Sequence, residues 1–499
     1  MYLRPARIPP LGLLVFVVGA ASLGTEIAAA RLLAPYFGAS TIVWANTIAT
    51  VLVALSLGYW AGGKLADRAP RLRPLCWMVL AAAVALAAVP HGARPFLDTA
   101  VGALERISAG AAIGSLLAVL VLAAGPVVLL GAVSPWAVRL SVRDVSESGS
   151  VAGRLYAIST AGSLAGTFLA ALLLVPFAGT HRTFLAFALA LALVAVLGLP
   201  RWALVVPAAM VALIILPPGS IRADGKVLYE TETPYQYARV VEDGDGTRRL
   251  ELNEGLVVHS LYRPGSYLTN DYWDDFLVLP QAVRGGAPGS IAILGNAAGT
   301  TARAYGHYFP ATRIDGVDID GRLSDIGRRY FDLHAPRLRL ITADARPFLH
   351  ATGRRYDAIF IDAYRQPYIP FYLATREFFA LARQRLTKDG VLVINVGHPT
   401  SSDRLERSLG ATLRTVFPSV WRDPVEPTNT LVLATTGKAL PARLSAAAPG
   451  LPSELRPIAL DAARHLAPAL SGGEVLTDDR APVEWMIDGS IIDYAAGKR

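Results

Sequence analysis

The segment that decides the fold is Ile291-Ala292-Ile293-Leu294-Gly295-Asn296-Ala297-Ala298-Gly299-Thr300. Its four leading apolar residues predict a short buried strand, and the glycine-rich residues after them predict a tight turn that opens a helix. Further strands and helices alternate along the chain behind it. This alternation is typical of a parallel sheet with helices on both faces. We therefore predict a Rossmann-like α/β domain over residues 286–499.

Acidic residues close the next three predicted strands, which end in Asp318, in Asp344-Ala345 and in Asp362. Ligands of such sheets bind beyond the carboxyl ends of the strands, where these carboxylates and the glycine-rich turn come together. Asp318 can accept from both ribose hydroxyls, Asp344 can accept from an adenine amino group, and Asp362 lies nearest the reacting end. The pattern predicts a nucleoside site whose turn residues are Gly295, Asn296 and Gly299. A nicotinamide cofactor is the competing hypothesis, although it would favour a tighter Gly-x-Gly-x-x-Gly turn.

The first 220 residues differ in composition from the rest. Hydrophobic residues make up 53% of the whole chain and charged residues 17%, and almost all the long apolar runs lie between residues 11 and 217. Runs of about 17 to 25 residues can cross a bilayer as helices. We predict an N-terminal α-helical membrane bundle over residues 1–220, with the lipid bilayer as its partner. The predicted spans are Leu11–Ala30, Ile42–Gly62, Leu75–Val89, Ala111–Val133, Tyr156–Ala178 and Thr183–Leu199.

A seventh apolar run, Ala203–Leu216, decides the topology. At ~1.5 Å per residue it covers only about 21 Å of a ~30 Å hydrocarbon core, so we interpret it as interfacial or re-entrant within a bundle of six to seven helices. An excess of Lys and Arg marks cytoplasmic loops, and the basic residues at 4–7, 64–73 and 139–154 fall on one side if the N-terminus is cytoplasmic. Six crossings then leave the C-terminal half in the cytoplasm, whereas seven would place it outside.

Residues 221–285 predict a small β-strand domain. Tyr237–Glu242 and Arg248–Leu252 are rich in strand-forming residues and flank the turn Asp243-Gly244-Asp245-Gly246. This segment precedes the glycine-rich break that begins at Gly285. It therefore stands between the predicted membrane bundle and the Rossmann-like domain.

The composition excludes several kinds of site. The single cysteine, Cys76, leaves no disulfide framework and no cysteine-based zinc site, and the 8 histidines have no metal-ligand spacing. We therefore predict no metal. The formal net charge is +8, but the basic residues form no block with interleaved aromatic residues, so we predict no nucleic-acid partner.

Several short motifs together make the chain resemble a known family. Pro234-Tyr235-Gln236 and Leu252-Asn253-Glu254-Gly255 accompany the predicted small domain, and Val317-Asp318-Ile319-Asp320, Ala343-Asp344-Ala345 and Asp357 to Asp362 stand at the strand ends. With these motifs the chain resembles the spermidine synthase family of polyamine aminopropyltransferases, from about Thr231 to Trp485. The runs Gly58–Arg68, Asp362–Pro370 and Leu476–Glu484 resemble the membrane-fused bacterial form of that family.

The resemblance implies a reaction and a role for several residues. Gln236, Asp318 and Asp344 would hold the methylthioadenosine part of a small-molecule substrate, which is S-adenosylmethionine or its decarboxylated form. Asp362 matches the family's proton acceptor, and an amine must be neutral to attack the carbon beside a sulfonium. The resemblance also implies that no metal is used, that the protein is a multi-pass protein of the bacterial inner membrane, and that its catalytic domain is cytoplasmic. The resemblance is compatible with a homodimer and does not decide the oligomeric state.

The chain departs from the family in the part of the site that holds the amine. The family's second aspartate after the proton acceptor is Arg365 here, the aspartate of its glycine-rich loop is Ala298, and the histidine of its Tyr-His-Glu stretch is Trp273. Tyr364 belongs to an aromatic cluster that matches the family's gate. Arg365 would repel a diamine and suits a carboxylate, unless it pairs with Asp362 or Glu377. We therefore hypothesise that intact S-adenosylmethionine is cleaved to methylthioadenosine, either by aminocarboxypropyl transfer or by its own carboxylate, which would form a lactone.

Three other functions stay open. The chain can be a conventional spermidine synthase whose changed residues are compensated elsewhere. It can be an S-adenosylmethionine-dependent methyltransferase, because the fold is of the methyltransferase type. It can also be a transporter or sensor whose α/β half binds a nucleoside without turnover.

Overall fold

The computed structural model describes residues 11–37, 41–104, 110–216, 225–253, 258–364, 369–398, 400 and 402–487. The chain forms two compact units. The first, here the helical unit, comprises Met1–Ala223 and Glu232–Tyr237, and the second, the α/β unit, comprises Asp224–Thr231 and Ala238–Arg499. Gln236 therefore groups with the helical unit.

Six helices of the helical unit are long and apolar enough to cross a membrane. They contain 19 to 34 residues, with a mean hydropathy of 1.4 to 2.7, and a rise of ~1.5 Å per residue makes even the shortest about 28 Å long. The prediction of six spans is confirmed by length and composition, with the third span longer than predicted, and Arg201–Ile215 forms a shorter apolar helix. The six are Leu11–Ala34, Val43–Arg68, Leu72–Ala93, Ile113–Ser141, Val145–Ala178 and Thr180–Gly198.

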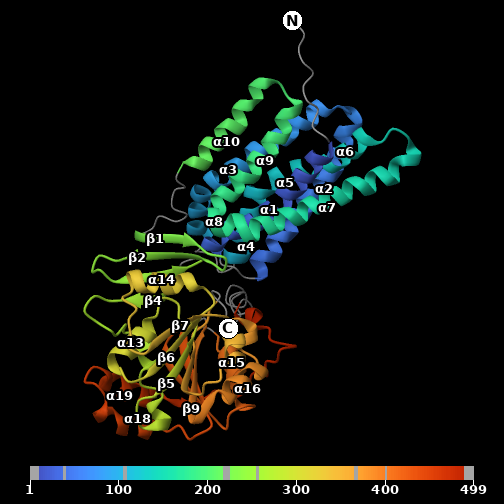
Figure 1. Cartoon of the computed structure of the whole chain (residues 1–499). Helices are drawn as coiled ribbons and strands as arrows, with labels where there is room; N and C mark the ends of the chain where they lie inside the picture. Colours follow the sequence, from blue (N-terminus) through green and yellow to red (C-terminus); the bar gives the residue numbers. More distant parts are fainter. Residues whose placement is uncertain are drawn as a thin grey trace. The chain divides into compact units, whose positions relative to one another are not determined.

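Two of these spans are interrupted by π-helical segments, Leu120–Ala124 and Leu169–Leu174. Each segment is followed by a proline, Pro126 or Pro176, near the start of the next helix. Proline has no N–H to continue the helical hydrogen-bond ladder, which explains the local change of pitch. The helices labelled in Figure 1 are α1 (Leu11–Phe37), α2 (Thr41–Arg68), α3 (Leu72–Leu104), α4 (Gly110–Val119), α5 (Gly125–Gly131), α6 (Val133–Ser141), α7 (Ser148–Phe168), α8 (Val175–Ala178), α9 (Thr180–Ala195) and α10 (Val205–Ile215).

Glycines bring α1 and α7 into backbone contact. A Cβ on Gly162 or Gly166 would stand 2.1 Å from the carbonyl oxygen of Phe16 or Ala20. Such close approach of two helices is the usual role of small residues in membrane bundles. A Cβ on Gly153, in contrast, would have no neighbour within 4 Å.

A four-stranded sheet follows, in the order β1-β2-β3-β4. Its strands are β1 (Lys226–Glu232), β2 (Tyr237–Glu242), β3 (Arg248–Leu252) and β4 (Val258–Tyr262), and β3 pairs antiparallel with β2 and with β4. Gly246 closes the β2–β3 turn at φ +81°, a conformation that favours glycine. The predicted strands and hairpin are confirmed.

The α/β unit contains an eight-stranded sheet in the order β12-β10-β11-β9-β8-β5-β6-β7. The strands from β7 to β9 are parallel, whereas β11, β10 and β12 add an antiparallel edge that the sequence pattern did not predict. The chain moves outward from β5 to β7 and then returns to the other side of β5. This reversal between β5 and β8 is the place where such sheets bind ligands, beyond the carboxyl ends of the strands. The strands are β5 (Ser290–Leu294), β6 (Arg313–Asp318), β7 (Leu338–Thr342), β8 (Tyr356–Ile361), β9 (Leu386–Gly397), β10 (Ser419–Glu426), β11 (Asn429–Thr435) and β12 (Ala467–Pro468).

Helices cover both faces of this sheet, as predicted. On one face α15 (Ala345–Ala351), α16 (Arg376–Gln384) and α17 (Arg404–Arg414) pack through residues such as Phe348, Phe378 and Leu409. On the other face α13 (Thr300–Tyr308), α18 (Pro441–Ala447) and α19 (Leu455–His465) pack through Tyr305 and Leu455 (Figure 1). The sheet is therefore the middle layer of three, and only its strand ends are open to a ligand.

Candidate active site

The glycine-rich turn runs from the end of β5 to the start of α13. Gly295 and Gly299 have φ of +90° and +88°, where residues with a Cβ are strained. A Cβ on Gly295 would stand 2.5 Å from the carbonyl oxygen of Asp362, so the backbone after β8 lies directly against the turn. Asn296 is 5% exposed, and its amide oxygen and nitrogen have no hydrogen-bond partner within the described part of the chain. The turn thus holds a buried donor and acceptor that a ligand can use.

Asp318, at the end of β6, is tied to the same turn. One of its carboxylate oxygens accepts from the Ala297 N–H at 2.8 Å, and the other accepts from the Asp320 N–H at 2.9 Å. Burial raises the pKa of Asp318 to about 6, against the opposing effect of these two donors. Each oxygen retains a lone pair, so the carboxylate can also accept from the hydroxyls of a ribose.

Asp344 follows β7 and begins α15. Its carboxylate accepts from the Arg346 N–H at 3.0 Å, which caps the helix, and from the Tyr372 hydroxyl at 2.8 Å. The backbone places it beside Asp318, because the Ala343 N–H donates to the Asp318 carbonyl at 2.9 Å. Ala345 is the buried first residue of α15. The predicted neighbourhood of the second and third strand ends is therefore present.

Asp362, directly after β8, is the most heavily hydrogen-bonded of the predicted residues. It accepts from the Tyr272 hydroxyl at 3.2 Å, from Trp273 Nε1 at 3.0 Å and from Asn395 Nδ2 at 3.0 Å. Burial raises the pKa of Asp362 to about 6, and the three donors oppose this rise. The carboxylate is thus fixed in position, ionised at neutral pH, and basic enough to accept a proton.

These donors come from elements far away in sequence. Trp273 begins α11 (Trp273–Phe276), and Asn395 lies in β9, where its Oδ1 accepts from Asn429 in the neighbouring β11 at 2.9 Å. Tyr364 does not point at Asp362; its hydroxyl donates to the Asn395 carbonyl at 2.9 Å and accepts from the Gly397 N–H. The sequence predicted Trp273 and Tyr364 at this end but missed Tyr272 and Asn395. A lone polar residue inside the apolar run of β9 was the available signal for Asn395.

Two further carboxyl groups are linked to Asp362 by hydrogen bonds that Tyr272 makes. The Tyr272 N–H donates to Asp271 at 2.8 Å and to Glu426 at 3.1 Å, while its hydroxyl reaches Asp362. Burial, followed by a hydrogen bond with the Asp271 carboxyl, raises the pKa of Glu426 to about 7. Glu426 is therefore partly protonated near neutral pH, and a neighbouring cation would lower its pKa and favour the ionised form. Sequence reasoning did not find either residue.

The remaining predicted residues are Ala298, Gln236 and Arg365, and the structure describes the first two. Ala298 is fully buried, and its N–H donates to the Ser260 hydroxyl in β4 at 3.0 Å. Gln236 lies in the segment that groups with the helical unit, where its carbonyl accepts from the Thr233 N–H at 2.9 Å. Arg365 lies outside the described residues. Among the described residues, the glycine-rich turn, Asp318, Asp344 and Asp362 thus form one continuous edge.

Comparisons with known proteins point to one group. The model of the spermine/spermidine synthase domain matches residues 281–434. A probable polyamine aminopropyl transferase of Bifidobacterium longum (strain NCC 2705) is 35% identical over 190 residues, which is 38% of this chain and 42% of that protein. A polyamine aminopropyltransferase of Synechococcus sp. (strain JA-3-3Ab) is 30% identical over 220 residues, which is 38% of this chain and 68% of that protein. Among solved structures, a probable spermidine synthase from Corynebacterium glutamicum ATCC 13032 is 22% identical, covering 50% of this chain and 98% of its own, with a TM-score of 0.39.

Proposed function

This chain belongs to the polyamine aminopropyltransferase (spermidine synthase) family, and from that premise we propose that it transfers the aminopropyl group of decarboxylated S-adenosylmethionine to an amine. In this reaction the nitrogen of the acceptor attacks the carbon bonded to the sulfonium. The carbon–sulfur bond breaks, its electron pair stays on sulfur, and neutral methylthioadenosine leaves. The new secondary ammonium loses one proton to a base, which leaves the neutral secondary amine.

The observation that carries the proposal is the setting of Asp362. Three donors hold its carboxylate, and its pKa of about 6 leaves it ionised at neutral pH but a better base than an exposed carboxylate. It stands against the glycine-rich turn, beside the strand ends that carry Asp318 and Asp344. We assign to Asp362 the role of proton acceptor and to Asp318 and Asp344 the ribose and adenine contacts. The role expected of Gln236 stays a prediction, because this residue groups with the helical unit.

The Asp271–Glu426 pair supports a cationic arm and an amine acceptor. Two neighbouring carboxyls attract ammonium groups, and a cation beside them lowers the pKa of Glu426 and favours its ionised form. The family has aspartates at the positions that Ala298 and Arg365 occupy here. We propose that the Asp271–Glu426 pair takes over the role of those two aspartates. The pair would repel a substrate carboxylate, and this disfavours intact S-adenosylmethionine.

A second candidate rests on Arg365 alone. An arginine three residues after the base suits the carboxylate of intact S-adenosylmethionine, which would then be cleaved to methylthioadenosine by aminocarboxypropyl transfer or by lactone formation. The two candidates differ in which sulfonium is consumed. An assay of methylthioadenosine release with each sulfonium, with and without a diamine, separates them and tests the proposed transfer.

The helical unit gives the proposed enzyme its location. Six helices can cross a membrane, and an even number of crossings returns the α/β unit to the side of the N-terminus. We propose that this side is the cytoplasm of a bacterium, where adenosyl sulfonium compounds are made, and that the bilayer of the inner membrane surrounds the six spans.

A further inference from the structure

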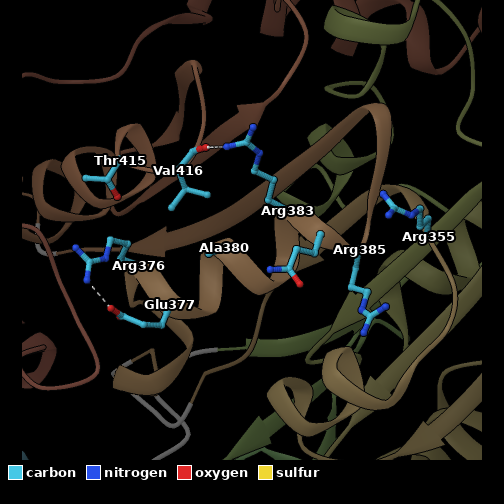
Figure 2. A pocket seen from close by; sticks show the side chains of 9 residues that line it. Arg355, Arg376, Glu377, Ala380, Arg383, Arg385, Thr415 and Val416 are labelled. Carbon is cyan, nitrogen blue, oxygen red and sulfur yellow. Dashed lines mark hydrogen bonds and ion pairs between the residues drawn. The ribbon is translucent and has the colours of Figure 1, made fainter.

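A second candidate site lies at the amino ends of the parallel strands, whereas Asp362 lies at their carboxyl ends. A cavity of about 850 Å³ runs along α16, and four arginines line it: Arg355, Arg376, Arg383 and Arg385. Figure 2 shows them distributed around α16, with Arg376 at one end of the helix and Arg383 and Arg385 at the other. Arg355 precedes β8 and Asp362 follows it, so six strand residues at ~3.3 Å each separate the two sites by about 20 Å.

The charges of this arginine pocket are poorly neutralised. Arg376 pairs with Glu377 at 2.8 Å, and of the described residues that line the pocket only Glu377 is acidic. Among the described residues, the other three arginines have only carbonyl partners: Arg355 donates to Leu386, Arg383 to Val416, and Arg385 to Leu349 and His350. Three arginines therefore line one cavity without a carboxylate partner among the described residues.

The carbonyl bonds also hold these guanidinium groups in place. Arg385 bonds to the last turn of α15 at 2.7 Å and 3.0 Å, and Arg383 bonds just beyond α17. Each guanidinium has five N–H donors and so keeps others for a ligand. Helix capping alone would explain Arg383 and Arg385, but Arg355 bonds to the first residue of a strand and Arg376 to its neighbour. Capping therefore does not explain why all four line one cavity.

From the charge, the anchoring and the size of this cavity, we infer that the arginine pocket binds an anion that carries a phosphate group. Arginine forks match phosphate oxygens with paired hydrogen bonds, and the buried Val416 and half-buried Ala380 add an apolar wall. The volume exceeds that of a single phosphate, so the ligand is a phosphorylated metabolite or a phospholipid headgroup. This inference does not depend on the proposed transferase activity.

Calorimetry on the full chain in detergent tests the inference. Pyrophosphate and dihexanoyl phosphatidic acid are the probes, and dihexanoyl phosphatidylcholine is the zwitterionic comparison. The pocket variant is Arg355→Gln with Arg376→Gln, because neither of these arginines bonds α16 to another helix, as Arg385 does to α15. The control variant is Arg328→Gln with Arg464→Gln, which removes the same charge from exposed ion pairs outside the pocket.

We expect one saturable site in the unchanged protein and in the control variant, and affinity weaker by about tenfold or more in the pocket variant, since charge-assisted bonds are lost. Tighter binding of pyrophosphate would identify a soluble ligand, and tighter binding of phosphatidic acid a lipid headgroup. Absence of saturable binding in the unchanged protein would overturn the inference, as would equal affinities in the two variants. If the pocket variant loses its thermal transition, Arg355→Gln alone is compared with Arg328→Gln.

Discussion

Asp362 gathers three donors from two distant segments of the chain around a single carboxylate. Its pKa of about 6 follows mainly from burial, and the proposed role requires the ionised form. Protonation therefore removes activity as the pH falls through 6, whereas above about pH 7 the group is fully ionised. We expect kcat/KM, at a fixed concentration of neutral amine, to fall about tenfold per pH unit below 6.

Asp362→Asn should lower the release of methylthioadenosine by about 10²- to 10⁴-fold, because the amide cannot accept the proton. The rate that remains should have lost the acid limb of its pH profile. The control is Asp325→Asn, which changes an exposed aspartate on α14 (Gly321–Tyr330). It should leave the rate of methylthioadenosine release and the pH profile unchanged. An undiminished rate in Asp362→Asn would show that the reaction does not use this base.

Glu426 tests the cationic end of the site. Glu426→Gln keeps an oxygen for the Tyr272 N–H but removes the charge, so we expect KM for the amine to rise about tenfold with kcat within twofold. Glu474→Gln, at an exposed ion pair with Arg480, should change neither parameter. Equal KM values in the two variants would place the amine elsewhere.

The predictability of the site differs residue by residue. Asp318, Asp344 and Asp362 follow apolar strand runs, so local pattern and the geometry of parallel strands were sufficient to place them at one edge. Tyr272 and Asn395 meet Asp362, and Glu426 meets Tyr272, only through tertiary packing, across sequence distances that no local pattern encodes. Trp273 was predicted at the substrate end, but its bond to Asp362 was not.

At the scale of elements, the β5–α13 turn is the most constrained connection of the α/β unit. Gly295→Ala adds a Cβ where φ is +90° and the Asp362 carbonyl lies 2.5 Å away. We expect a loss of stability of about 2 kcal/mol or more from strain and displacement, together with loss of activity as Asp362 shifts.

Gly286→Ala is the matched control, because a Cβ there meets nothing within 4 Å and φ is not positive. It should change the free energy of unfolding by less than about 0.5 kcal/mol. Thermal unfolding followed by circular dichroism, with kcat/KM alongside, measures both variants. Similar values for the two would mean that the turn adapts to a side chain.

For the secondary-structure elements too, local sequence patterns were predictable and pairings between distant segments were not. Strands β5 to β8 were predicted in the order and type observed, because each is a short apolar run between turn residues. The antiparallel edge formed by β11, β10 and β12 was missed. β10 and β11 form a local hairpin, but β11 pairs with β9, and β12 with β10, across more than 30 residues.

At the scale of the whole molecule, six membrane spans predict that both ends of the chain lie on one side. Cys76 is the only cysteine, so Cys76→Ser gives a background for single introduced cysteines. In intact cells a membrane-impermeant maleimide should label Gly92→Cys and should spare Ser146→Cys and Ser471→Cys until the cells are opened. Labelling of Ser471→Cys in intact cells, with Ser146→Cys still protected, would mean a seventh crossing and an external active site.

The identity of the consumed sulfonium and of the product tests the proposed function most directly. The full chain is incubated with decarboxylated or intact S-adenosylmethionine, with and without putrescine, and the products are identified by mass spectrometry. We predict equal amounts of methylthioadenosine and an aminopropylated amine, formed only from the decarboxylated sulfonium and only when the amine is present. Release of methylthioadenosine from intact S-adenosylmethionine without an amine would contradict aminopropyl transfer. A methylated product formed from either sulfonium compound would contradict it as well.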